Sequence, residues 1–305
     1  MMFENIKNKI KNAYRKHQTN RVQFKRSVTR SAGGDVGIYI LLAIVAVVMV
    51  LPMVYAVCQS LKPLDEIFVF PPRFFVISPT FDNFRDLFRT MADSWVPFSR
   101  YLFNTLFISI VGTLGNVVCS SYAAYAISKI RFPGRNFLFK IVTYSLMFNA
   151  TVTSISNFIL MSAFHMVDTY FAIIIPAFCT SFGLYLMKQF METNVNDSVL
   201  ESARLEGASE NKILWVIAMP MVKPAWATLI LFAFKDLWNT GANLYIYSEQ
   251  LKTMNYAISQ LVTAGIARSG VSAAATVVMM LVPIAVFIVS QNSVIQTMSS
   301  AGMKD

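Results

Sequence analysis

The stretch Asn196–Pro220, N-D-S-V-L-E-S-A-R-L-E-G-A-S-E-N-K-I-L-W-V-I-A-M-P, decides how this chain is organised. It is helix-forming but too polar to cross a membrane, and it lies between two apolar segments. Ser198 and Glu201 have the spacing of a capping box, which predicts a helix start, and Asn196 and Asp197 just before them are also good cap residues. Gly207 predicts the end of this helix, and Ser209 the cap of a second one that runs to the final proline. We therefore expect a short docking helix on the surface of a membrane protein.

The composition identifies the class of protein. Of the 305 residues, 55% are hydrophobic and 14% are charged, whereas soluble proteins carry about 25% charged residues. The apolar residues form separate long runs, which indicates an all-α polytopic membrane protein. The three cysteines have neither metal-ligand spacing nor a disulfide pattern. Six transmembrane helices are predicted, at about 37–57, 102–127, 138–161, 170–187, 222–245 and 271–295.

The charge distribution predicts the orientation. Residues 1–36 form an arm rich in Lys and Arg, which the positive-inside rule places in the cytoplasm together with the N-terminus. No apolar core follows within the reach of a signal peptide, so we expect no cleaved leader. Six spans then put the C-terminus and the 196–220 loop in the cytoplasm as well. The arm accounts for most of the net charge of +10, which therefore implies contact with membrane lipid and no nucleic acid.

The 196–220 loop resembles the conserved loop of ABC-importer permeases, E-A-A, three residues, G, nine residues, I-x-L-P. Here the pattern reads E-S-A, then G, then I-A-M-P, and it departs from the family at two positions. The resemblance implies a type I ABC importer permease fold, with the first helix docked on a separate ATPase. A plain amphipathic helix on the bilayer surface is the alternative interpretation. The ATPase-coupling residues implied are Glu201, Ser202, Ala203, Gly207, Ile217 and Pro220.

Further motifs resemble the carbohydrate-type permeases, specifically the second permease subunit of maltose-type systems. They are L-K-P-x-x-E at 61–66 and P-T-x-D-N-F at 79–84 in the first long loop, then A-A-Y-A at 123–126 followed by F-P-G-R at 132–135. The resemblance runs from about Tyr39 to the C-terminus. It implies a second permease subunit in a heterodimer, two ATPase subunits, an extracellular sugar-binding protein and a bacterial cell membrane.

The fifth predicted span contains charges at depth. Lys235 and Asp236 fall in the outer half of the membrane, where a charge facing lipid costs up to about 2.5–3.5 kcal/mol. They are expected to face a cavity, or to form an ion pair or an interface with the partner subunit. Trp238-Asn239 resembles the family's W-N, and sugars stack on aromatic rings. The polar patch of the third span either binds substrate or joins helices. The candidate substrate-pathway residues are Lys235, Asp236, Trp238, Asn239, Asn149 and Asn157.

The expected function is that of a permease subunit of an ATP-binding-cassette importer for oligosaccharides or sugars. No G-x-x-x-x-G-K-[ST] occurs, so ATP and Mg²⁺ are expected on the partner ATPase. The chain itself is expected to be no enzyme and to hold no cofactor or metal. An importer for another solute, such as a peptide or a phosphonate, is the closest alternative. An ion-coupled secondary transporter is a weaker alternative, because it calls for inverted repeats and paired intramembrane charges, whereas the sequence shows no repeat and carries charges at depth only in the fifth span.

Overall fold

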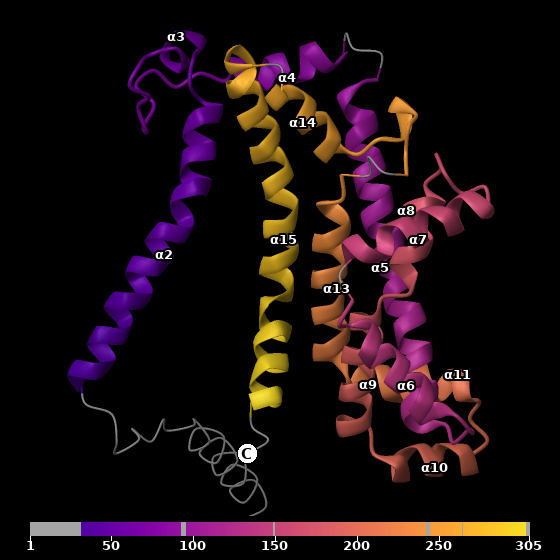
Figure 1. Cartoon of the computed structure of the whole chain (residues 1–305). Helices are drawn as coiled ribbons and strands as arrows, with labels where there is room; N and C mark the ends of the chain where they lie inside the picture. The colour runs from indigo at the N-terminus through magenta and orange to yellow at the C-terminus, as the bar shows by residue number, and fades with distance from the viewer. Residues whose placement is uncertain (1–31, 93–95, 149, 242–244, 264, 303–305) are drawn as a thin grey trace, which may run out of the picture. The chain divides into compact units, whose positions relative to one another are not determined.

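The computed structural model describes residues 32–92, 96–148, 150–241, 245–263 and 265–302 (Figure 1). Across these residues the secondary structure is entirely helical, with no β-strand. The chain divides into two compact units, the first ending at Val54 and the second beginning at Tyr55. Helix α2 (Ala32–Ser60) is largely apolar after Asp35, and the boundary between the two units falls within it.

Several helices have the length and composition of membrane spans. Among the described residues there are four, and a fifth if a sharply bent pair counts as one span. This confirms the predicted all-helical membrane class, whereas the number of six stays a prediction. The four are Gly34–Ser60, Phe98–Lys129, Phe171–Asn194 and Ile266–Asn292, and the bent pair is Glu210–Met221 with Lys223–Trp238.

The third predicted span, 138–161, is interrupted. Helix α6 (Arg135–Ser145) ends before α7 (Ala150–Ala163) begins. The hydroxyl of Ser145 donates to the Val142 carbonyl at 2.6 Å, and the N–H groups of Met147 and Phe148 close tighter turns of the i→i+3 type on the carbonyls of Tyr144 and Ser145. Because a hydroxyl that takes a backbone carbonyl weakens the helical ladder, the helix ends at this serine.

The fourth predicted span, 170–187, is also divided and runs further than expected. It consists of α8 (Phe171–Phe178), which contains Pro176, and α9 (Ser181–Asn194). Thr180 starts α9 by accepting a hydrogen bond from the Gly183 N–H, as N-cap threonines do.

The fifth predicted span is shorter than expected. Helix α13 (Lys223–Trp238) ends seven residues before the predicted limit of 245, and residues 239–241 after it are non-helical. The side chains of Asn239 and Thr240 donate to the carbonyls of Lys235 and Asp236, at 2.8 and 3.0 Å. These contacts satisfy carbonyls that a continuing helix would use, so the helix stops.

Helix α5 (Phe98–Lys129) is the centre of the second unit, where it packs against α8, α9, α13 and α14. Figure 1 shows α10 (Asp197–Leu205) and α11 (Glu210–Lys212) at one end of this unit, the α10 end. Helices α4 (Asp82–Ala92) and α14 (Met254–Thr263) lie at the other, the α4 end. Helix α15 (Ser269–Gly302) runs from the α4 end toward the α10 end. Short pieces complete the unit, namely α3 (Leu64–Ile67), η2 (Glu249–Leu251) and η3 (Ile266–Arg268).

The loop after α2 is built by the polar residues of the motifs at 61–66 and 79–84. The ammonium of Lys62, which is buried, donates to the Arg73 carbonyl. The carboxylate of Glu66 accepts from the N–H groups of residues 77 and 78 at 2.8–3.2 Å. Asn83 donates to the carbonyls of Ser60 and Lys62, at 2.9 and 2.7 Å. The residues that carry the resemblance in this loop therefore hold its shape.

Helix α5 packs so closely on α9 that there is no room for a side chain at Gly183. A Cβ there would lie 2.7 Å from the Ser120 hydroxyl, 2.8 Å from that of Thr180 and 2.9 Å from the Asn116 amide oxygen. We expect Gly183→Ala to lower the free energy of unfolding by about 1–3 kcal/mol, as overpacking does. Thermal unfolding of the detergent-solubilised chain measures this. Gly241→Ala is the matched control because no atom lies within 4 Å of its Cβ position, and equal stabilities of the two variants would contradict the packing.

Candidate functional site

The candidate site is the segment 197–221, which folds into two helical pieces joined at a glycine. The first piece, α10, begins at Asp197 with Asn196 as its N-cap, although the Asn196 side chain makes no capping hydrogen bond. The helix thus starts at the alternative cap position, Asn196, and the predicted capping box of Ser198 and Glu201 is wrong. Ser198 already lies within the helix, where its carbonyl accepts from the Ser202 hydroxyl at 2.9 Å.

The predicted helix end at Gly207 is confirmed. Gly207 has φ +80°, a left-handed conformation that side chains with a Cβ disfavour. The N–H of Ala208 donates to the Ala203 carbonyl and that of Gly207 to the Arg204 carbonyl, both at 3.0 Å. This pair of bonds is the Schellman motif, which satisfies the last carbonyls of a helix.

The second helical piece contains α11, a π-helical turn η1 (Ile213–Ala218) and α12 (Met219–Met221). Ser209 caps it as predicted, because its hydroxyl accepts from the Lys212 N–H at 3.4 Å. Pro220 does not break the helix at its own position. The break follows at Val222, where this piece meets α13 at a bend of 87°. The wider π-helical turn before Pro220 leaves room for a ring that would clash with an ordinary helical turn.

Helix α10 has an inner and an outer face. Leu200 and Ala203 are buried in a core that also contains residues of α5, α9 and α13. Ala203, one of the coupling residues that the resemblance implies, therefore packs within its own chain and does not face a partner. Gly207 and the side chain of Leu205, which is 90% exposed, lie on the outside. Leu205 therefore offers an apolar contact to a partner, and the sequence reasoning did not single it out.

The other motif residues divide between these two faces. Glu201 and Ser202 are exposed, Ile217 packs partly buried against the core, and Pro220 is exposed. The exposed motif residues are therefore Glu201, Ser202, Gly207 and Pro220, and Leu205 is exposed beside them.

The start of α10 is tied to the end of α5. The ammonium of Lys129 donates to the Val195 carbonyl at 2.6 Å and to the Asp197 carboxylate at 2.7 Å. The Lys129 side chain is only 5% exposed, whereas that of Asp197 is 73% exposed. The hydrogen bond from Lys129 lowers the pKa of Asp197 below its ordinary value, so this carboxylate is charged at neutral pH.

The second piece is tied to α5 as well. The hydroxyl of Tyr125 donates to the Glu210 carboxylate at 2.6 Å, which also accepts from the Arg204 guanidinium at 2.7 and 3.2 Å. The hydroxyl of Tyr122 donates to Asn211 at 2.6 Å and accepts from the Trp215 indole at 2.9 Å. The Arg204–Glu210 ion pair thus joins the two pieces across the glycine.

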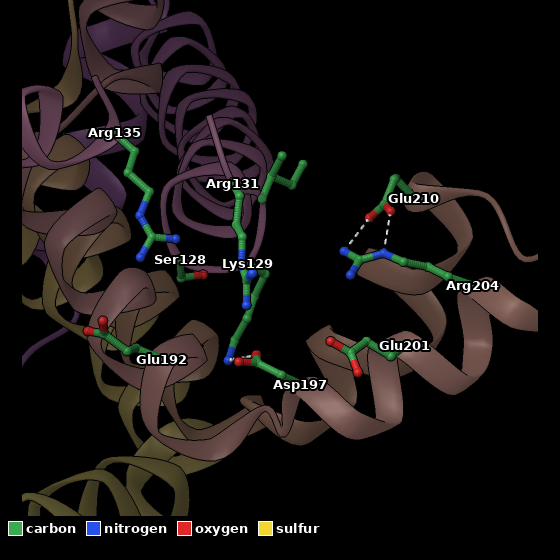
Figure 2. Close-up of a pocket in the computed structure, with 10 residues that line it drawn as sticks. Ser128, Lys129, Arg131, Arg135, Glu192, Asp197, Glu201, Arg204 and Glu210 are labelled. Atoms are coloured by element: carbon green, nitrogen blue, oxygen red, sulfur yellow. Dashed lines mark hydrogen bonds and ion pairs between the residues drawn. The ribbon is translucent and has the colours of Figure 1, made fainter. Parts of the chain in front are cut away.

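A polar cavity of about 570 Å³ lies among these groups (Figure 2). Basic side chains from the end of α5, the following turn and the start of α6 line one side, and side chains of α9, α10 and α11 line the other. Figure 2 shows Lys129 directed at Asp197, and Arg204 at Glu210. The lining residues are Ser128, Lys129, Ile130, Arg131, Arg135, Glu192, Asp197, Glu201, Arg204 and Glu210.

The predicted pathway residues of α13 fall into two groups. Trp238 is 1% exposed, donates to the Met279 carbonyl at 3.0 Å and stacks on Phe234. It therefore holds α13 against α15. Lys235 and Asp236 are exposed, and so is Asn239, whose carbonyl accepts from Asn255 at 2.6 Å.

A groove of about 740 Å³ lies between α13 and α15, lined mainly by apolar side chains. Lys235, Asn239 and Asn255 are among its few polar residues, and Asp236 does not line it. Asn157 on α7 is half-buried and lies outside the groove, and Asn149 lies outside the described residues. The structure therefore brings together only part of the predicted set.

Other polar residues join helices at the α4 end, and the sequence reasoning did not assign them a role. The carboxylate of Asp168 accepts from the N–H groups of Tyr247 and Ser248, at 2.9 and 2.7 Å. Asn104 on α5 donates to the carbonyls of Gln250 and Lys252, both at 2.8 Å. Within the described part of the chain, no three His, Cys, Asp or Glu side chains gather as a metal site.

Relatives by sequence are transport permeases, while no protein-family model matches. The chain is 29% identical over 215 residues to the polygalacturonan/rhamnogalacturonan transport system permease protein YtcP of Bacillus subtilis, covering 70% of this chain and 72% of the relative. The galactooligosaccharides transport system permease protein GanQ of Bacillus subtilis is 25% identical over 274 residues, 87% of this chain and 94% of that protein. The sn-glycerol-3-phosphate transport system permease protein UgpE of Yersinia enterocolitica is 26% identical over 208 residues, 68% and 74% of the two chains.

A solved structure shares the fold. It is a chain of a bacterial ABC transporter involved in the import of the acidic polysaccharide alginate, with a TM-score of 0.75 and 24% identity, covering 87% of this chain and 99% of that one. With its apolar helices, the chain is a multi-pass membrane protein. By sequence its homologues are the permease subunits of carbohydrate ABC transporters, and its fold is that of an ABC importer permease.

Proposed function

We propose that this chain is a permease subunit of a binding-protein-dependent ABC importer that takes up oligosaccharides across a bacterial cell membrane. The observation that carries the proposal is the segment 197–221, a two-piece element with a left-handed glycine and an exposed leucine, held at one end of a membrane bundle. Relatives whose names refer to galactooligosaccharides and to polygalacturonan support a sugar substrate. The relative named for sn-glycerol-3-phosphate makes a small phosphorylated solute the second candidate.

Six spans with both termini in the cytoplasm are part of the proposal. The broken pair α6 and α7 supplies the third span, and α13 the fifth. Two features support a cytoplasmic α10 end. Arg131 in the turn after α5 and Arg135 at the start of α6 lie there, as the positive-inside rule requires. The C-terminal part of α15 also runs to this end (Figure 1).

The mechanism follows from what the 197–221 segment offers a partner. Its outer face docks in a cleft of an ATPase subunit, in the manner of a helix in a groove. ATP and Mg²⁺ are bound by two such ATPase subunits, while this chain contributes no catalytic group. Closure of the ATPase pair moves the docked segments, which rocks this chain against a second permease subunit between inward-open and outward-open states. An extracellular sugar-binding protein delivers the substrate at the α4 end.

The groove between α13 and α15 is the proposed substrate-facing surface of this subunit. Lys235 and Asn239 supply a charge and an amide for sugar hydroxyls, while Trp238 is the buried support behind them. Asp236, Asn149 and Asn157 lie outside this surface or outside the described residues. In the alternative arrangement, Lys235 forms an ion pair with the second permease subunit, which then covers part of the same surface.

Gly207 provides the first test of coupling. A β-branched residue costs about 1–2 kcal/mol in the left-handed region and projects into the docking face. We expect Gly207→Val to leave the amount of chain in the membrane unchanged, while ATP-driven uptake of the solute held by the co-purifying binding protein falls about tenfold or more.

Two companion variants sharpen this test. Gly207→Asn tolerates the left-handed conformation but still adds a side chain, so a loss of uptake in both variants indicates close approach by a partner. Gly241→Val is the matched control at a glycine with open space around it and no positive φ. Normal uptake by Gly207→Val would remove the coupling role.

Alanine substitutions of Lys235 and Trp238 test the groove, because we expect the first to lower uptake alone and the second to lower the stability of the chain. Trp238→Ala removes a buried ring and a hydrogen-bond donor, so we expect about 3–5 kcal/mol of destabilisation and less chain in the membrane. Lys235→Ala removes an exposed side chain, so the amount of chain should stay constant while uptake falls. Quantified membrane levels beside solute uptake separate the two. If Lys235→Ala takes up solute normally, this groove is not the substrate surface.

A further inference from the structure

Three side chains at the α10 end of α5 attach the segment 197–221 to this helix: Tyr122, Tyr125 and Lys129. We propose that these three contacts make α5 the element that carries the motion of the docked segment through the membrane to the α4 end. The inference rests on the proposed function, because it presumes an ATPase that moves the segment. It adds the route by which that motion is transmitted.

The three side chains Tyr122, Tyr125 and Lys129, here called the anchors, lie on one face of α5. Their positions differ by three and four residues, the spacing at which side chains of an α-helix lie above one another. Each anchor contacts a different part of the segment. Lys129 binds Asp197 at the start of α10, Tyr125 binds Glu210 at the start of the second piece, and Tyr122 contacts the π-helical turn beyond it.

Attachment at several points keeps the segment from turning about Gly207. The Arg204–Glu210 ion pair closes the angle between the two pieces, and the same carboxylate accepts from Tyr125. Hydrogen bonds to charged groups are stronger than those between neutral groups. The nearly buried ammonium of Lys129 would lose its compensation if it separated from Asp197 and the Val195 carbonyl. The segment and the end of α5 therefore move together.

The covalent connections on either side transmit motion less directly. Before α10, the chain passes through two extended residues, Val195 and Asn196. After α12, it enters α13 at the 87° bend near Val222. In contrast, α5 is a single helix of 32 residues without an internal proline, about 48 Å long at 1.5 Å per residue.

The far end of α5 is bonded to the loop that follows α13. Tyr101 donates to the Glu249 carboxylate at 2.7 Å, Asn104 donates to two carbonyls of this loop, and the Thr105 hydroxyl accepts from the Met254 N–H at 2.8 Å. One continuous helix is thus hydrogen-bonded to the segment 197–221 at one end and to residues 249–254 at the other. Displacement at one end changes these contacts at the other.

Hydrogen exchange of the assembled complex tests this route with MgATP as the only added ligand. The complex is captured through a tag on this chain, placed in lipid nanodiscs, and compared nucleotide-free and trapped with MgATP and vanadate. In the unmodified complex, we expect amide exchange in peptides covering 249–263 to differ about tenfold between the states. In Tyr122→Phe/Tyr125→Phe, which removes two hydroxyls and keeps both rings, the difference should shrink to less than about threefold, while ATPase subunits are retained and MgATP is still hydrolysed.

Control variants distinguish a loss of transmission through α5 from misfolding of the chain and from loss of ATPase binding. Tyr144→Phe removes an exposed hydroxyl from α6 and should keep the full exchange difference. If the double variant is depleted from the membrane, Lys129→Met tests the remaining anchor with the same readout. An unchanged exchange difference in the anchor variants overturns the route, as does its absence from the unmodified complex. Loss of the ATPase subunits from the anchor variants overturns it too, because the anchors then serve docking. If the unmodified chain captures no ATPase, the proposed function itself fails.

Discussion

The ammonium of Lys129 lies at the end of α5 beside the polar cavity, on a nearly buried side chain, between the carbonyl of Val195 and the carboxylate of Asp197. A buried cation requires such partners, because leaving it unpaired costs several kcal/mol. Its position therefore sets where α9 ends and where α10 begins relative to α5. The remaining contacts of the 197–221 segment, from Leu200 and Ala203 to Glu210, depend on this placement.

Polar side chains have a similar structural role at the opposite end of the second unit. Glu66 and Asn83 organise the loop after α2, whereas Asn104 and Asp168 fasten the loop after α13 to α5 and to the start of α8. Backbone groups in such loops would otherwise lack partners near the membrane, where unsatisfied polar groups are costly. The bundle is thus fastened by hydrogen bonds at both ends, with α5 common to both sets.

Neighbouring residues of α13 have two different roles, since one packs in the core and another is exposed to the groove. Trp238 fills the space between α13 and α15, while Lys235, one turn earlier, is exposed beside the same groove. A residue's type does not distinguish the two roles, because an aromatic ring serves equally well in a core and at a sugar site. The direction of each side chain from the helix decides, and that direction depends on where α15 lies.

The amino-acid sequence by itself determined the all-helical membrane class, because long apolar runs leave few other structures, and it determined the two-piece form of 197–221, because Gly207 and Ser209 act through local backbone chemistry. Local chemistry misled at Ser198 and Glu201, since Lys129, 69 residues before Ser198, draws Asp197 into the first turn. Only the tertiary structure decided that Ala203 faces inward, that Leu205 faces outward, and that Tyr122 and Tyr125 hold this segment. These outcomes depend on which helices meet, and contacts between residues so distant in the chain leave no periodic pattern in the sequence.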